Sequence, residues 1–278
     1  MHHPLIAKVI EHVRNNAAGG MLPAGLTVTL NFHPDALWQG RPVIDRLADD
    51  GIYHSQFETG ISNGGLTATP GGDRWRWESR IFGGHYDSAD PTMRPKYGAL
   101  NYLNRATGGS PRFGSAHLRL RSHVLSRTSF CYPDSFLNPV HFAVADRFNL
   151  IAEAERRNSS MDPLDRYIEA HVHGPLLLAD DVEAIVLDPC YRHTEVEAIA
   201  RALPCTLSWH PGFRMPISRI PQCICYRGRD IADLAASLAI DGHLTPRDIG
   251  LALRANEADV QKLKRVWHCV ARFGSPEA

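Results

Sequence analysis

Apolar and polar positions recur along this chain with two periods, one typical of helices and one typical of strands. The spacing of residues 5–17 predicts an N-terminal helix whose apolar face is formed by Leu5, Ile6, Val9, Ile10 and Val13. Residues 26–32 alternate in polarity and are rich in β-branched side chains, which predicts a strand that ends at His33. The two patterns are separated by Gly19, Gly20 and Pro23, which break the helix.

The same periods predict further elements in the middle of the chain. Helices are expected at residues 93–103, 142–157 and 194–203. Strands are expected at residues 117–128, 165–172, 175–178, 184–187 and 205–209. Residues 52–90 are aromatic, glycine-rich and irregular, and they are too apolar for a linker. We expect this stretch to be a folded loop region that lines a cleft.

The pattern becomes entirely helical near the C-terminus. Thr245, Pro246 and Asp248 are typical of a helix start, and residues 260–273 predict a final helix. We therefore expect one large domain at residues 1–228, including the N-terminal helix, and a small helical segment at residues 229–278.

Composition and charge exclude several classes of partner. Lys plus Arg number 30 and Asp plus Glu number 30, so no overall field favours nucleic acid or an anionic membrane. No apolar run approaches the roughly 20 residues of a membrane-spanning helix. The six cysteines form no compact disulfide framework, which favours a reducing, cytoplasmic setting. An effector exported by a dedicated machine would have the same composition.

Three separated stretches carry residue types that suit NAD cleavage. They are Leu30–His33, Phe82–Asp87 with Tyr97 beyond it, and Tyr167–Glu169. Breaking the nicotinamide–ribose bond develops oxocarbenium character, as in glycoside hydrolysis. Tyrosine rings can hold the cationic nicotinamide, a histidine can bond a ribose, and a carboxylate can stabilise the developing charge.

The ordered set resembles the ADP-ribosyltransferase superfamily, in the histidine–tyrosine–glutamate branch that includes poly(ADP-ribose) polymerases and diphtheria toxin. In that branch a strand ends in the histidine, and a glycine-rich segment follows that ends in Phe-Gly-x-Gly-x-Tyr. This chain has Gly60 to Leu66, then Pro70, then Phe82–Asp87, and its second tyrosine comes eleven residues after Tyr86. Residues 94–101 also resemble the Arg-Pro-Lys-Tyr-Gly-Ala-Leu-Asn motif of an uncharacterised bacterial domain family. The resemblance covers about residues 25–210.

The resemblance implies a fold and a set of roles. The fold would be α+β, with a split, mostly antiparallel sheet, flanking helices and the added C-terminal helical segment. His33 would bond an NAD ribose and the nicotinamide amide, Tyr86 and Tyr97 would flank the ring, and Glu169 would be the catalytic carboxylate. The expected remaining NAD-binding residues are Gly83, Gly84, Arg74, Arg80 and Arg94. The arginines would bind the pyrophosphate.

The expected activity is transfer of ADP-ribose from NAD to a protein or nucleic-acid acceptor, with release of nicotinamide and without a metal. Water as acceptor would make the protein an NAD glycohydrolase. A transferase fold that binds without cleaving, or a helical tail that binds DNA, is the non-catalytic alternative. Structural zinc is weighed on three pairs, His171 with His173, Cys190 with His193, and Cys223 with Cys225. A serine hydrolase is disfavoured because the Gly-x-Ser-x-Gly run at residues 60–64 lies in the irregular stretch and not at an expected strand-to-helix elbow.

Overall fold

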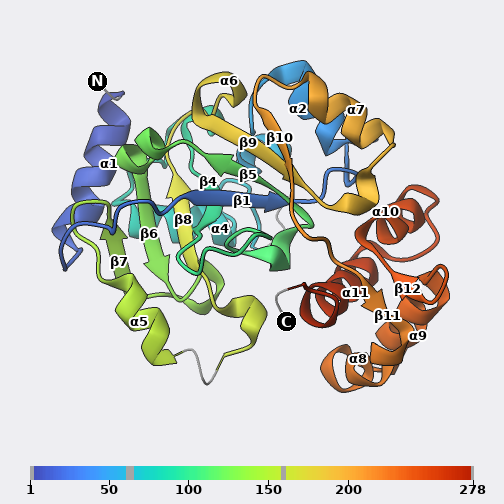
Figure 1. The fold of residues 1–278 in the computed structure, drawn as a ribbon. Helices are drawn as coiled ribbons and strands as arrows, with labels where there is room; N and C mark the ends of the chain where they lie inside the picture. The colour runs from blue at the N-terminus through green and yellow to red at the C-terminus, as the bar shows by residue number, and fades with distance from the viewer. Residues whose placement is uncertain (1–2, 61–65, 158–160, 277–278) are drawn as a thin grey trace.

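Eight strands join into one continuous sheet at the centre of the molecule (Figure 1). The computed structural model describes residues 3–60, 66–157 and 161–276. The strand order is β10-β9-β5-β1-β4-β8-β6-β7, and only the β9–β10 pair is parallel. The bounds are β1 Val28–Phe32, β4 Lys96–Leu100, β5 Ala116–Leu120, β6 Thr128–Tyr132, β7 His141–Val144, β8 Ile168–Val172, β9 Val182–Leu187 and β10 Thr206–Trp209.

Helices cover both faces of this sheet. The face with the largest apolar core is covered by α2 (Val43–Asp50), α5 (Leu150–Arg157), α6 (Leu178–Asp181) and α7 (Glu195–Ala202). The opposite face is covered by α1 (Pro4–Asn15) and α4 (Asp73–Ile81), whose apolar side chains form a second cluster. In sequence the β2–β3 hairpin (Leu37–Trp38, Arg41–Pro42) comes between β1 and α2, and the short α3 (Gln56–Thr59) comes between α2 and α4.

The C-terminal part forms a third core of its own. Helices α8 (Ile220–Arg227), α9 (Arg229–Leu238), α10 (Pro246–Arg254) and α11 (Val260–Phe273) cluster beside the sheet, together with the β11–β12 pair (Met215–Pro216, His243–Leu244) (Figure 1). This core also takes in Phe213 and Met215, which precede residue 229 in sequence. Among the described helices, none is both long enough and apolar enough to cross a membrane.

The fold confirms the coarse expectation of an α+β protein with a large, mostly antiparallel sheet and flanking helices. The N-terminal helix, the strand before His33 and the helix start at Thr245 are also confirmed. The described sheet is continuous rather than split. The comparison of residues 60–66 with the transferase motif cannot be followed in space, because residues 61–65 lie outside the described ranges.

Several local predictions are wrong, and long-range strand pairing explains most of them. The expected helix at 93–103 is strand β4, held between β1 and β8. The expected helix at 142–157 begins as β7 and becomes helical only at Leu150. The expected strand at 117–128 stops at Leu120 and continues as a 3-10 helix.

Two other segments also differ from the expectation. Residues 175–178 contribute only one isolated bridge, between Ile52 and Leu177, before α6 begins. The region 52–90, expected to be irregular, contains α3 and α4. In α4, Arg74, Trp77 and Glu78 are buried, which gives this polar stretch a packed side that its low apolar content did not indicate.

Candidate active site

Strand β8 divides its side chains between the two faces of the sheet. Ile168, Ala170 and Val172 enter the largest apolar core. Because successive side chains of a strand point to opposite faces, Glu169 and His171 lie on the other face. Glu169 is directly opposite Ala99 of β4 and Cys131 of β6 in the ladder. The neighbouring strands therefore set the surroundings of this carboxylate.

The carboxylate of Glu169 is buried and fully partnered. Its Oε1 lies 2.9 Å from Nε2 of His171, and its Oε2 accepts hydrogen bonds from the backbone N–H and hydroxyl of Ser135 at 3.4 and 3.1 Å. Burial alone favours the neutral acid, but the hydrogen bond and charge of His171, with Arg74 and Ser135, outweigh it. The pKa of Glu169 is therefore lowered, and the group is ionised at neutral pH.

Arg74 and Tyr97 form a stacked pair beside Glu169. The guanidinium of Arg74, on α4, lies 4.1 Å from the ring centre of Tyr97, on β4. Its Nη1 donates to the hydroxyl of Ser135 at 2.6 Å, so Ser135 links the arginine to the carboxylate. The hydroxyl of Tyr97 donates to Oε1 of Glu78 at 2.8 Å. Tyr97 thus presents its ring to a cation, which is a favourable cation–π contact.

Two adjoining pockets share part of their lining, and together they are called the cleft below. The smaller pocket, about 60 Å³, is lined by Glu169, Arg74 and Ser135 among others. The larger pocket, about 430 Å³, is lined by His33, Trp38 and Arg46 among others. Three residues line both pockets, namely Tyr53, Gln56 and Tyr97. Glu169 therefore lines one part of the cleft, His33 lines the other, and Tyr97 borders both.

His33 lies well away from Glu169 within this cleft. In the ladder Glu169 of β8 is opposite Ala99 of β4, and Ala99 is opposite Thr29 of β1. His33 comes four residues after Thr29, just past the end of β1. At about 3.3 Å per residue along a strand and about 4.8 Å between strands, the Cα atoms of Glu169 and His33 are roughly 16 Å apart. The ring of His33 packs on Trp267, with centres 4.8 Å apart. Burial lowers the pKa of His33 to about 4, so the ring is neutral at pH 7.

The motif with Gly83, Gly84 and Tyr86 lies outside the cleft. Tyr86 is fully buried, and its hydroxyl lies 2.8 Å from Nδ1 of His173. Gly83 and Gly84 form a left-handed turn after α4, and a Cβ on Gly83 would stand 2.7 Å from the ring of His12. None of the three lines either pocket. In this conformation Tyr86 and Tyr97 do not face each other across a ligand-sized space.

The three predicted arginines have three different settings. Arg74 lines the cleft, as expected for a ligand-binding residue. Arg94 is buried and donates to Glu78 at 2.6 Å and to the backbone oxygen of Tyr86 at 2.8 Å, so its charge is used within the protein. Arg80 is exposed on α4 and lines neither pocket. Of these three predicted arginines, Arg74 alone therefore stands where it can contact a ligand in the cleft.

Other cleft residues were not singled out from the sequence. Ser135 begins a 3-10 helix after β6, and nothing in its local pattern indicates a contact with a carboxylate 34 residues later. Three side chains of the larger pocket carry a buried polar atom without a hydrogen-bond partner among the described residues, namely Trp38 Nε1, Arg46 Nε and Gln56 Oε1. Such atoms are costly to bury and are often satisfied by a ligand or water.

Cys131 is also close to Glu169, and its setting disfavours a cysteine hydrolase. Its sulfur lies 3.8 Å from both Oε1 of Glu169 and Nε2 of His171. Burial, with the charge of Glu169, raises the pKa of the Cys131 thiol well above its usual value, so the protein alone keeps it protonated. Nε2 of His171 faces both the Cys131 sulfur and Glu169. In a catalytic triad the carboxylate would hold one ring nitrogen and the other would take the proton of the thiol, which is not the arrangement here.

The C-terminal helices form one wall of the larger pocket. Leu253, Asn256 and Val260 line it, and Trp267 of α11 donates its indole N–H to the backbone oxygens of Pro111 and Arg112 at 3.1 and 3.0 Å. These contacts pack the C-terminal helices against the residues that carry the sheet. In the helical tail weighed above for DNA binding, Nζ of Lys262 lies 3.9 Å from a carboxylate oxygen of Asp230.

Comparisons with known proteins assign the chain to a family whose function is described as unknown. No curated protein matches the chain. Residues 27–160 and 150–273 match a family described as "Protein of unknown function (DUF3626)". The matched residues include every side chain of the cleft and most of the helical segment. The chain therefore belongs to this DUF3626 family.

Proposed function

We propose that this protein cleaves NAD at the nicotinamide–ribose bond and transfers ADP-ribose to an acceptor. One observation carries the proposal: Glu169 and His33, from distant segments, line two adjoining pockets, and Tyr97, from a third segment, lines both. Arg74, from a fourth segment, lines the smaller pocket. The family resemblance nominated the first three on sequence grounds alone, and Arg74 was expected from its position in the stretch predicted to line a cleft.

Glu169 is suited to stabilise a cation that develops during bond breaking. It is ionised, buried and held by Ser135 and His171, so its charge does not have to reorganise as the reaction proceeds. A fixed charge in a site with little water stabilises an oxocarbenium-like transition state more than the ground state. In the proposed mechanism Glu169 also polarises the ribose 2′-hydroxyl, and nicotinamide departs as a neutral molecule.

The ring of Tyr97 is suited to bind a nicotinamide pyridinium in place of the Arg74 guanidinium. The ring of Tyr97 already carries the guanidinium of Arg74 at 4.1 Å. The smaller pocket has room for little more than a few water molecules, so a nicotinamide ring requires Arg74 to move. In the proposed complex the pyridinium takes the place of Arg74 on the tyrosine, and Arg74 turns to the pyrophosphate. Tyr97, rather than a pair of tyrosines, then carries the ring.

The larger pocket is suited to the adenosine end of the dinucleotide. Its volume of about 430 Å³ lies within the range of small-molecule sites. The unpartnered atoms of Trp38, Arg46 and Gln56 offer two donors and one acceptor to a polar ligand. His33, roughly 16 Å from Glu169, would then bond the distal ribose rather than the nicotinamide amide.

The decisive experiment follows nicotinamide release from NAD by the full chain. We expect release by the wild type and a loss of about 10²- to 10³-fold in Glu169→Gln, the scale of removing one preorganised group. Glu183→Gln is the matched control, because Glu183 is an exposed glutamate on β9 paired only with Arg119 at the surface. Equal rates in Glu169→Gln and wild type would remove Glu169 from the mechanism.

The acceptor is identified in the same experiment with labelled NAD and a cell lysate. Label on protein or on nucleic acid names the acceptor class, whereas nicotinamide release without labelled macromolecules means that water is the acceptor. No turnover of NAD by the wild type under any of these conditions, with NAD still retained, would instead support a non-catalytic binding protein.

A further inference from the structure

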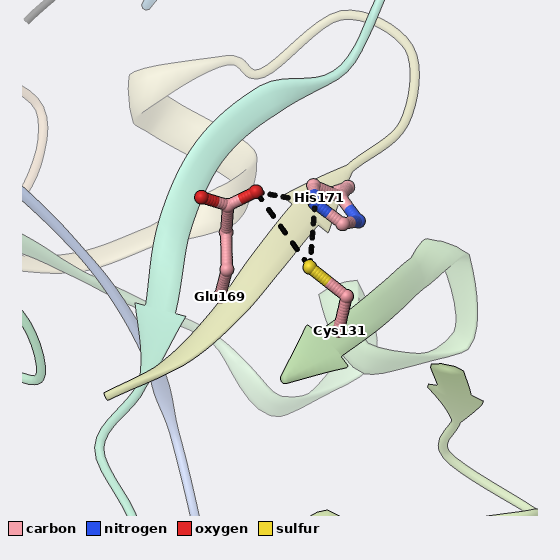
Figure 2. A group of neighbouring side chains, drawn as sticks. All are labelled: Cys131, Glu169 and His171. Atoms are coloured by element: carbon pink, nitrogen blue, oxygen red, sulfur yellow. Dashed lines mark hydrogen bonds and ion pairs between the residues drawn. The ribbon is translucent and has the colours of Figure 1, made fainter. Parts of the chain in front are cut away.

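Three side chains with metal-binding atoms meet on the polar face behind the cleft. Figure 2 shows Cys131 on β6 turned toward Glu169 and His171 on β8. Sγ of Cys131 lies 3.8 Å from Oε1 of Glu169 and 3.8 Å from Nε2 of His171, and that oxygen and nitrogen are 2.9 Å apart. Of the described residues, only these three bring such atoms within 4.8 Å of one another.

The three separations are close to those of a tetrahedral zinc site. Zinc bonds of about 2.3 Å to sulfur and about 2.0 Å to nitrogen and oxygen place sulfur about 3.6 Å from the other two ligands, and these about 3.3 Å from each other. The observed separations of 3.8, 3.8 and 2.9 Å differ from these values by less than about half an ångström. Side-chain adjustment alone is enough to admit the ion.

The chemistry of the ligands selects the kind of metal. A thiolate, an imidazole and a carboxylate suit zinc, whereas calcium and magnesium prefer oxygen ligands alone. All three side chains are buried, so the total charge at the centre matters. A thiolate and a carboxylate together carry two negative charges, and a divalent cation cancels them. Binding therefore releases the thiol proton of Cys131 and leaves a neutral buried centre.

A chain of buried hydrogen bonds holds the imidazole in the orientation that a metal needs. Nδ1 of His171 lies 3.2 Å from the hydroxyl of Ser129, which lies 2.8 Å from Nε2 of His173. Nδ1 of His173 in turn lies 2.8 Å from the hydroxyl of Tyr86. A second partner on the far nitrogen is the usual support of a metal-bound histidine. This chain also gives Tyr86, which stands outside the cleft, a supporting position.

We propose that Cys131, Glu169 and His171 form a binding site for Zn²⁺ with three protein ligands and one open position. Because Glu169 lines the smaller pocket, the ion reaches the site through the cleft. The bound ion neutralises the carboxylate that the proposed function requires. Zinc is then an inhibitor of NAD cleavage, and this consequence alone rests on the proposed function.

The binding test uses Co²⁺ as a coloured substitute for zinc on the reduced full chain. We expect one Co²⁺ per chain, with a thiolate-to-cobalt charge-transfer band and the visible bands of a tetrahedral site, all removed by added Zn²⁺. Cys131→Ser should lose the charge-transfer band, and Cys225→Ser, which changes an exposed cysteine on α8, should keep it. A wild type without the band, or a band that persists in Cys131→Ser, would overturn the proposal.

Two further measurements test the metal site even if the Cys131→Ser variant does not fold. Ser129→Ala removes the support of His171 without removing a ligand, and it should weaken Co²⁺ binding by about 10- to 100-fold. Unchanged Co²⁺ affinity in this variant would contradict the described site. In a separate assay, Zn²⁺ should suppress nicotinamide release and a chelator should restore it. Metal binding without any NAD cleavage would sink the proposed function and leave the metal site standing.

Discussion

The two faces of the central sheet are built from alternate residues of the same strands, yet they differ in kind. On one face Leu30, Phe130 and Ile168 enter a core of apolar side chains. On the other, the next residues along are Asn31, Cys131 and Glu169, so the buried polar side chains Asn31 and Glu169 share this face with an apolar cluster that contains Cys131. The apolar face gains stability from the removal of hydrocarbon from water. The polar face must satisfy each buried group with a partner, which fixes its side chains in place.

The comparison teaches where the fold can accommodate a reactive group. A buried carboxylate such as Glu169 costs free energy unless it is paired and hydrogen-bonded. Here the partners His171 and Ser135 come from the same strand and from a loop after its neighbour, so they are fixed by the sheet itself. The opposite face supplies the stability that allows this arrangement. Changes on the two faces should therefore have different effects on stability and on activity.

The largest expected effect on stability belongs to the apolar face. Phe130 is fully buried and packs edge-on against Phe148, with ring centres 5.4 Å apart. Phe130→Ala should lower the free energy of unfolding by about 3–5 kcal/mol, measured by urea denaturation. Activity per folded molecule should not change. Val140→Ala, an exposed apolar position, should stay within about 0.5 kcal/mol of wild type. Similar losses in both variants would contradict the assignment of the core.

A buried carboxylate without a full set of partners should show the opposite pH behaviour to Glu169. Asp35 is 2% exposed, and its Oδ2 has no hydrogen-bond partner among the described residues. Burial raises its pKa from 3.8 to about 6, against the opposing charges of Arg254 and Arg247. The folded state therefore holds this proton more tightly than the unfolded chain does. Its contribution to stability is fully present below pH 3.8 and is lost as the pH rises through 6.

Asp35→Asn tests this sign directly. Removing the titration should raise the free energy of unfolding above pH 6 by up to about 3 kcal/mol relative to wild type, with the difference shrinking toward pH 4. The measurement is a series of urea denaturation curves from pH 4 to pH 8. A difference that is constant with pH, or one that grows on acidification, would show that Asp35 is ionised throughout.

The next effect separates two arginines of the same helix. Arg74→Gln should raise the KM for NAD by about 10- to 100-fold, because a charge-assisted hydrogen bond contributes about 1.5–3 kcal/mol. Arg80 is exposed on the same helix and lines neither pocket, so Arg80→Gln should leave the KM for NAD unchanged. Steady-state kinetics of the two variants decide the point. Equal KM values would mean that the arginine on the cleft does not contact the substrate.

The smallest effect concerns the tyrosine that lies outside the cleft. Tyr86→Phe removes the hydrogen bond to His173 and should cost about 1 kcal/mol of stability. The rate and KM of NAD cleavage should remain those of the wild type, measured at the same folded fraction. A tenfold fall in rate would instead indicate that Tyr86 moves to the nicotinamide ring when NAD binds, as the sequence resemblance implies.

Local pattern predicted those parts of the fold whose neighbours are close in sequence. The N-terminal helix, strand β1 and the C-terminal helices follow from apolar spacing and capping residues. Strand β4 did not, because Gly98 and Ala99 have no strong strand preference and only pairing with β1 and β8 makes them extended. Pairing of this kind depends on register across many residues, which a single sequence does not display.

The candidate site divides in the same way. Once residues 168–172 form a strand, alternation alone places Glu169 and His171 on one face. The contact with Cys131 depends on the β6–β8 register, and the contact with Ser135 depends on a loop conformation. Tyr86 shows the reverse case: its spacing to Tyr97 suits a clamp, but the turn after α4 buries its ring against His173. A spacing in sequence does not fix a side chain's direction in space.

The indole of Trp267 has a consequence for how this family can be studied in fragments. It anchors the last helix to Pro111 and Arg112 and presses on the ring of His33, while its own unit supplies one wall of the larger pocket. A shortened protein ending near residue 228 would therefore expose His33 to water and open that pocket along one side. Ligand affinity measured on such a fragment would describe a different cavity, so binding studies need the tail attached.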